Sequence, residues 1–127
     1  MLFSACSQKY PLDLGGGYKI EYDPASYFCL VDTNNTIVVN AHITKFKFDS
    51  IFIIIEQKPV DLILKDTYNN PDWNLKKRDS LFEESTLRSY WIINKRKACS
   101  YGPYQKNKYL EKMLKLKVPQ ELLVNEK

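Results

Sequence analysis

The sequence predicts an α+β fold, in which a mainly antiparallel β-meander sheet carries a C-terminal amphipathic helix packed on one face. Three observations lead to this prediction. In the first half of the chain, short segments alternate apolar and polar residues and are joined by links of turn length. Residues 51–55 are apolar without alternation, which is typical of a central strand covered on both faces. Residues 105–116 place apolar side chains at helical spacing.

The first half of the chain is expected to form extended segments at residues 18–22, 26–31 and 36–48. Each is rich in β-branched or aromatic side chains, and Asp, Asn and Pro residues supply the turns between them. Within the last segment, Phe46 and Phe48 fall on the same face. We expect both rings to point into the core and the lysines beside them to point to water.

The second half begins with the predicted central strand, residues 51–57, and later forms a hairpin from residues 89–94 and 98–101. The hairpin is followed by a helix over residues 105–116, which should pack on one face of the sheet. The expected apolar stripe of this helix consists of Tyr109, Leu110, Met113, Leu114 and Leu116.

Residues 60–87 form a polar, turn-rich segment that is too long for an ordinary loop. Ser80 and Glu83 have the spacing of a capping box, in which Ser80 would be the N-cap of a short helix that runs to Leu87. Insertions of this kind often cover a sheet or line a site, so this segment is the first place to look for function.

The composition describes one ordinary globular domain, which we assign to residues 17–124. The chain has 127 residues, of which 44% are hydrophobic and 27% charged, and this is enough to bury a core. No apolar run approaches the roughly 20 residues of a membrane-spanning helix. The net charge of +4 is carried by dispersed lysines rather than by a basic patch, so we expect no nucleic-acid partner.

Residues 1–16 indicate a signal-peptide remnant, a lipid-attachment cysteine and a flexible tether. Small residues precede Cys6 in the run Leu2-Phe3-Ser4-Ala5-Cys6, as the lipoprotein signal peptidase requires, and Gly15-Gly16-Gly17 is a flexible linker sequence. The expected location is the cell envelope, with a lipid anchor in the membrane and the domain facing the periplasm. The alternative is a start methionine followed by a short arm of a cytoplasmic protein.

Lipid on Cys6 would leave Cys29 and Cys99 as a pair in a compartment that permits disulfides. They could form a disulfide if their Cα atoms lie within about 7 Å of each other. The alternative is that both are small buried apolar side chains on strands. No Cys-x-x-Cys motif occurs and there is one histidine, so we expect no metal site.

The sequence contains no catalytic motif and no cofactor-binding motif. His42 is the one imidazole, and its position near a strand end favours a structural role over that of a general base. Carboxylates are spread along the long middle segment, where solvated surface charge is the simplest interpretation. They are Asp66, Asp72, Asp79, Glu83 and Glu84.

Three aromatic residues of the middle segment, Tyr68, Trp73 and Phe82, are candidates for a binding surface. Exposed together, they would offer a patch to a partner. The alternative is that they anchor the segment onto the sheet, since buried aromatic rings supply much of a small core.

The closing hairpin contains Tyr90-Trp91-Ile92-Ile93-Asn94-Lys95 and Tyr101-Gly102-Pro103, and a lysine-rich helix follows it. This pattern resembles an uncharacterised family of small bacterial lipoproteins, known as a domain of unknown function. Asp13-Leu14-Gly15 with Gly17-Tyr18, and Phe52-Ile53-Ile54 with Gln57-Lys58-Pro59, fit the same pattern. The resemblance implies an envelope lipoprotein with a cysteine ahead of the Asp-Leu-Gly segment, and it brings no catalytic residues.

Two classes of function remain. The first is a non-enzymatic lipoprotein domain that binds a protein or an envelope component, with a periplasmic immunity or inhibitor protein as a special case. The second is a small hydrolase with an unrecognised site. A flat aromatic surface would favour the first class, and a cleft that holds His42 beside two carboxylates would favour the second.

Overall fold

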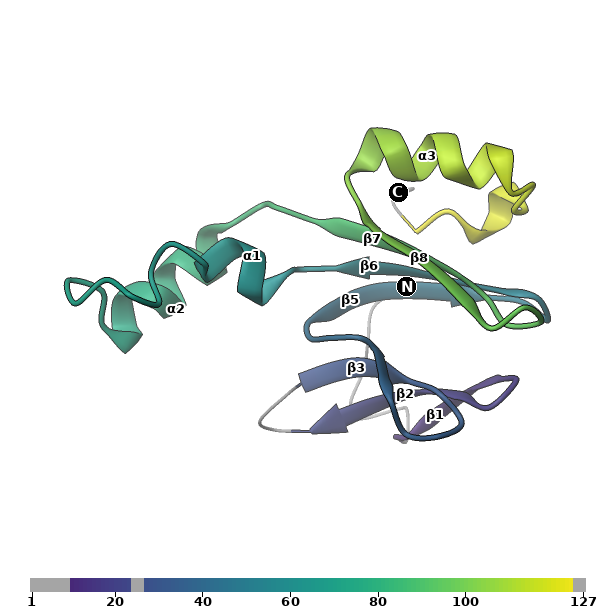
Figure 1. The fold of residues 1–127 in the computed structure, drawn as a ribbon, viewed down its shortest axis with the longest axis horizontal. Coiled ribbons are helices and arrows are strands. Elements are labelled where there is room, and N and C mark those ends of the chain that lie inside the picture. Colours follow the sequence, from purple (N-terminus) through teal and green to yellow (C-terminus); the bar gives the residue numbers. More distant parts are fainter. Residues whose placement is uncertain (1–9, 24–26, 125–127) are drawn as a thin grey trace.

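The computed structural model describes residues 10–23 and 27–124, and this part of the chain contains two antiparallel four-stranded sheets and three α-helices (Figure 1). The α+β class is therefore confirmed. In chain order the elements are β1 (Leu12–Gly15), β2 (Tyr18–Asp23), β3 (Tyr27–Val31), β4 (Ile37–Val39), β5 (Ile43–Phe48), β6 (Phe52–Gln57), α1 (Val60–Leu64), α2 (Leu75–Glu84), β7 (Ser89–Asn94), β8 (Cys99–Tyr104), α3 (Lys106–Lys115) and the 3-10 turn η1 (Gln120–Leu122).

The strands divide between two sheets, where the sequence predicts one. The first sheet has the order β1-β2-β3-β4 and the second the order β5-β6-β7-β8, and all neighbouring strands are antiparallel. The predicted strand 36–48 is in fact β4 and β5, which belong to different sheets. Short links identify strands that are close along the chain, but they do not show which strands share hydrogen bonds.

The two sheets and α3 form three layers, with the β5–β8 sheet in the middle (Figure 1). Each sheet turns one apolar face toward the other, and these faces interdigitate as in a β-sandwich. The buried residues between the sheets are Leu14, Tyr18, Ile20, Leu30, Val39, Ile43, Phe46, Ile53, Ile55 and Ile93.

Strand β6 is the central strand that its unbroken apolar run predicts. All six of its residues are buried. Ile53 and Ile55 pack in the core between the sheets, whereas Phe52 and Ile54 pack in the second core, beneath α3. Alternate side chains of a strand point to opposite faces, so a strand between two apolar layers is apolar on both faces, as residues 52–55 are. The last two positions of β6, Glu56 and Gln57, are buried but polar.

A bulge in β5 changes which of its side chains reach the core. The pairing of β5 with β6 shifts register between Ile43 and Lys45. As a result Ile43 and Phe46, three residues apart, are both buried in the same core. The prediction for Phe46 is confirmed. The prediction for Phe48 is wrong, because its ring is 42% exposed near the end of the strand.

Helix α3 lies within the predicted range, but its buried stripe is narrower than predicted. Tyr109 and Met113, one turn apart, are buried against the second sheet, and Leu110 and Leu116 pack at the edge of that core. Leu114 is 69% exposed, so its assignment to the stripe is wrong. The arc of a helix that contacts a sheet spans about 100°, and a residue next to Met113 in sequence is rotated out of that arc.

The folded domain begins earlier than residue 17. Leu12–Gly15 is a strand rather than part of a tether, because it pairs with β2 and buries Leu14 in the core. The Nζ of Lys95 donates hydrogen bonds to the carbonyl oxygens of Leu14, at 2.6 Å, and of Asp49, at 2.5 Å. These bonds join the first strand to the second sheet. The predicted signal remnant and Cys6 lie outside the described residues.

Residues 60–84 form a two-helix arm, here called the α1–α2 arm, that extends beyond the sheets (Figure 1). The predicted N-cap at Ser80 is wrong. Helix α2 begins at Leu75, and its N-cap is Asn74, whose side chain accepts a hydrogen bond from the Lys77 amide at 2.8 Å. Asn is as effective as Ser as an N-cap. Because Asn74 precedes Ser80 in the chain, the helix has already begun before it reaches Ser80.

Candidate functional site

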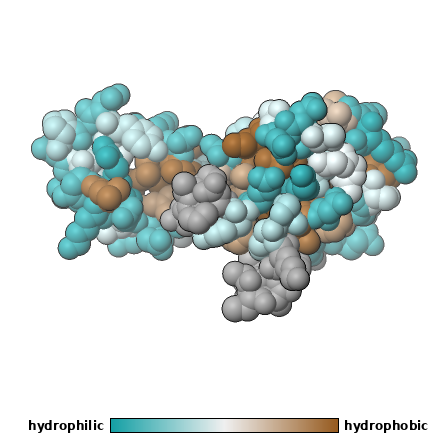
Figure 2. All heavy atoms as spheres, turned by 90° about the horizontal axis from the view of Figure 1, so that it is seen from below, coloured by the Kyte–Doolittle hydropathy of each residue, from teal (hydrophilic) through white to brown (hydrophobic). Residues whose placement is uncertain are grey.

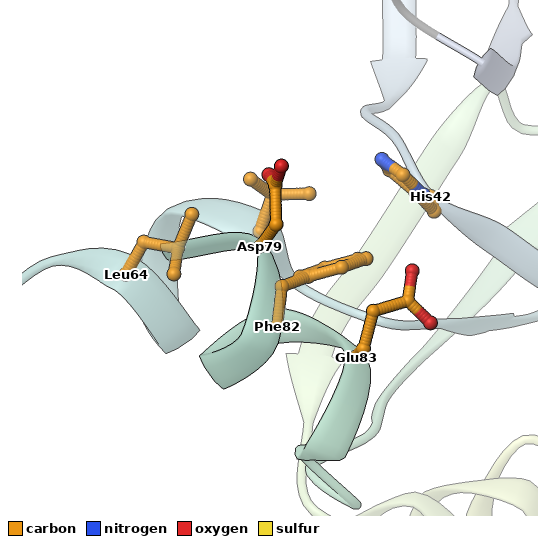
Figure 3. Close-up of a pocket in the computed structure, with 6 residues that line it drawn as sticks. His42, Leu64, Asp79, Phe82 and Glu83 are labelled. Atoms are coloured by element: carbon orange, nitrogen blue, oxygen red, sulfur yellow. The ribbon is translucent and has the colours of Figure 1, made fainter. Parts of the chain in front are cut away.

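A pocket lies where the α1–α2 arm meets the sheets (Figure 3). Its volume is about 450 Å³, which is in the range of small-ligand sites. In Figure 2, hydrophobic residues gather beside a hollow between the arm and the main body. The residues that line the pocket are His42, Val60, Leu64, Asp79, Phe82 and Glu83.

The backbone at the end of the second sheet positions His42 and Lys58 beside α2. The amide of His42 donates to the Lys58 carbonyl at 3.1 Å, and the amide of Lys58 donates to the His42 carbonyl at 2.8 Å. These two bonds extend the β5–β6 ladder by one residue pair. The two side chains are thereby held at the edge of the sheet from which the arm departs.

Phe82 connects the arm to this edge of the sheet. The centroid of its ring is 4.7 Å from that of His42, with 57° between the ring planes. The Nζ of Lys58 lies 4.3 Å from the Phe82 centroid and donates to the Glu83 carbonyl at 3.3 Å. The Lys58 ammonium is stabilised by the face of the aromatic ring and also by the negative, C-terminal end of the helix dipole. The last turn of α2 is therefore held in place beside the pocket.

The surroundings of His42 favour its neutral imidazole over the imidazolium. Burial lowers the pKa of His42 below its usual value of 6.5, the Lys58 ammonium lowers it further, and the Glu83 carboxylate partly opposes both. A neutral imidazole offers one donor and one acceptor nitrogen. In this form the ring adds no charge to the pocket.

Two carboxylates supply the charge of the pocket. Asp79 and Glu83 are one helical turn apart on α2, and Figure 3 shows both on the side that faces the open space between the arm and His42. Both residues are exposed to solvent. Val60, Leu64 and Phe82 provide the apolar wall. The pocket thus combines an acidic rim with an apolar lining.

The arm is stiffened by a small polar cluster that sequence analysis missed. Arg78 donates from Nη2 to the Thr67 carbonyl at 2.8 Å and from Nε to the Thr67 hydroxyl at 3.2 Å. That hydroxyl donates to the Leu64 carbonyl at 2.8 Å, and Thr67 is 2% exposed. The cluster joins the end of α1 to α2 and so fixes the shape of the pocket wall.

The three aromatic candidates do not form one surface. Tyr68 is 48% exposed, and its hydroxyl lies 3.4 Å from Asp61 Oδ1. Trp73 borders a shallow depression on the other side of α2, while Phe82 lines the pocket. Tyr68 and Trp73 lie in the connection between α1 and α2, whereas Phe82 lies in the last turns of α2, so closeness in sequence does not bring the three rings onto one side of the arm.

Cys29 and Cys99 are not joined by a disulfide. Cys29 is buried in β3 of the first sheet, whereas Cys99 is exposed at the start of β8 in the second. The two cysteines therefore lie on different sheets, whereas the sequence predicts one sheet. Cys6 is outside the described residues.

The described residues contain neither a metal-binding group nor a membrane-spanning helix. No set of three or more His, Cys, Asp or Glu side chains in residues 10–23 and 27–124 is arranged to hold a metal ion. No helix in these same ranges is long and apolar enough to cross a bilayer. The pocket-lining residues that are described also include no Ser, Thr or Cys that could act as a nucleophile.

Comparison with known proteins gives a family but no activity. No curated protein and no solved structure matches the chain. A family described as "Protein of unknown function (DUF3997)" matches residues 16–126, a range that includes every strand except β1, the α1–α2 arm and the pocket, and that begins after Cys6. Because the match covers most of the chain, this protein belongs to the DUF3997 family of proteins of unknown function.

Proposed function

We propose that this domain acts by binding, and that the pocket at the base of the α1–α2 arm receives a basic side chain of a partner protein. The observation that carries the proposal is the pairing of the Asp79 and Glu83 carboxylates with an apolar wall in one pocket. A lysine or arginine side chain has the matching form, since it carries a cationic end on an aliphatic stem. The stem would lie along Val60 and Leu64.

The charges around the pocket support a cationic ligand. Its lining carries two carboxylates, and the ammonium of Lys58 beside it offsets one of them. His42 adds no positive charge, because burial keeps its pKa below 6.5. An ammonium or guanidinium group would therefore meet a net negative rim.

Binding of short peptides to paired variants tests the proposal. The probes are a labelled peptide with one central lysine and the same peptide with norleucine, which keeps the stem and removes the charge. The D79N/E83Q variant should lose at least about tenfold in affinity for the lysine peptide, because charged hydrogen bonds contribute roughly 1.5–3 kcal/mol. D66N, which removes a carboxylate of the arm outside the pocket, should bind normally. Equal binding of both peptides, or an unchanged D79N/E83Q variant, would contradict the proposal.

A small hydrolase is the second candidate, and one observation favours it. The pocket holds His42 together with two carboxylates, the arrangement that a histidine general base needs. Binding is preferred because the lining described above offers no nucleophile and no set of converging donors for an oxyanion. Turnover of a chromogenic ester or glycoside that disappears in H42A would reverse this preference.

We further propose that the domain is held at a bacterial envelope membrane by lipid on Cys6. The support is the Leu2-Phe3-Ser4-Ala5-Cys6 pattern together with the lipoprotein resemblance of the closing hairpin. Figure 1 places β1, the first strand after Cys6, away from the tip of the α1–α2 arm, so an anchored domain would leave the arm accessible.

Metabolic labelling with a palmitate analogue tests the anchor. When the gene is expressed from its natural reading frame, the protein should incorporate label and partition into detergent. C6S should lose both properties, while C99S, the same change at an exposed cysteine of the folded domain, should keep them. An unlabelled protein in the soluble fraction, or a labelled C6S variant, would contradict the anchor.

A further inference from the structure

Helix α2 has its charges in the order that a helix dipole disfavours. Lys76, Lys77 and Arg78 lie in its first turns and Glu83 and Glu84 in its last, with no acidic residue in the first turn and no basic residue in the last. Cations at the N-terminus and anions at the C-terminus each oppose the macrodipole. The order therefore does not serve the stability of the helix itself.

A shallow depression of about 370 Å³ lies along the outer face of α2, the face opposite the pocket. All residues of α2 are described, and none of them is buried. Figure 2 shows the arm as a separate lobe whose visible surface is mostly hydrophilic. The residues that line the depression are Trp73, Lys76, Lys77, Ser80, Leu81 and Glu84.

We propose that two copies of this chain associate through this outer face, with their α2 helices antiparallel across a two-fold axis that passes near Ser80. In a two-fold contact, a residue that lies a given distance before the axis meets the residue that lies the same distance after it in the other copy. Lys76 is four residues before Ser80 and Glu84 four residues after it. The contact thus pairs Lys76 with Glu84 twice.

The residues around this axis fit the contact. Lys76 and Lys77 line the depression in the first half of α2 and Glu84 lines it in the second half, so the basic half of each helix faces the acidic half of the other. Ser80 is small, which permits close approach at the axis. Trp73 and Leu81 add apolar surface to the depression. The reversed charge order of α2 is then explained as complementarity between two copies.

The predicted dimer is weak and sensitive to salt. Helix α2 has ten residues and is therefore about 15 Å long, so the contact is smaller than the roughly 800 Å² per partner of a standard interface. Its ion pairs are at the surface and will be screened as ionic strength rises. The contact uses a different face of α2 from the pocket, so the dimer and the proposed function can each fail without the other.

Cross-linking at the axis tests the dimer. In a chain with C6S and C99S, the additional change S80C should give a covalent dimer under mild oxidation, since two copies of residue 80 meet at the axis. K65C, an exposed position of the same arm away from the depression, is the matched control and should cross-link much more slowly. Equal rates for S80C and K65C would overturn the proposal, as would a chain that sediments as a monomer at millimolar concentration and low salt.

Charge reversal separates a specific contact from random collision. K76E or E84K alone should slow the S80C cross-link about tenfold, because both symmetric pairs change from attraction to repulsion. The double change K76E/E84K restores opposite charges and should recover the original rate. These residues are exposed, so circular dichroism should be unchanged in all three variants. A double variant as slow as the single ones would contradict the antiparallel pairing.

Discussion

At the scale of single residues, His42 makes the contacts that define the pocket. Its ring contacts Phe82, and its backbone pairs with Lys58. The sequence identified His42, Asp79 and Glu83 separately, but assigned them to a strand end and to a solvated segment. They come together because β5 and α2 meet in space, and no spacing rule links residues about 40 positions apart in sequence.

Titration of the single histidine tests these surroundings. By NMR, the pKa of His42 should lie below 6.5, since burial and Lys58 both disfavour the imidazolium. K58M removes a positive charge and should raise this pKa, whereas E83Q removes a negative charge and should lower it. The folded state favours the neutral ring. The contribution of His42 to the free energy of unfolding is therefore fully present above pH 6.5, and it is lost as the pH falls and the unfolded chain takes up a proton first. Shifts of the same sign in K58M and E83Q would contradict the described geometry.

At the scale of elements, periodicity predicted which segments fold but not which neighbours they meet. The alternating segments are strands, and the range of α3 is close to the prediction. The bulge in β5 and the start of α2 were missed. A bulge depends on the partner strand, and the helix start was decided by Asn74, which competes with the capping box at Ser80.

Paired alanine substitutions in α3 test how this helix packs. M113A should lower the free energy of unfolding by about 2–5 kcal/mol, because a buried side chain is truncated. L114A, at the neighbouring position, should change it by less than about 0.5 kcal/mol, because Leu114 is 69% exposed. Urea unfolding of both variants measures the difference. Similar losses in the two variants would mean that α3 is rotated from the orientation described.

At the scale of the whole molecule, three packed layers support an arm that carries little of the core. Leu64 is the one core residue that the arm contributes, and both faces of α2 remain available. Stability therefore resides mainly in the layers, and the proposed recognition in the arm, a division that is common for segments outside a rigid scaffold. The α+β class could be predicted from local patterns. The division into two sheets could not, because it depends on long-range pairing.

The central claim is that the pocket binds a cationic side chain next to His42. The most direct measurement follows the His42 ring resonance by NMR while the lysine peptide is added. The account predicts a saturating shift of this resonance and a further decrease of the His42 pKa, since a cation then lies beside the ring. The norleucine peptide should cause neither change. A resonance that stays in place at saturating lysine peptide, or an equal response to both peptides, would contradict the account.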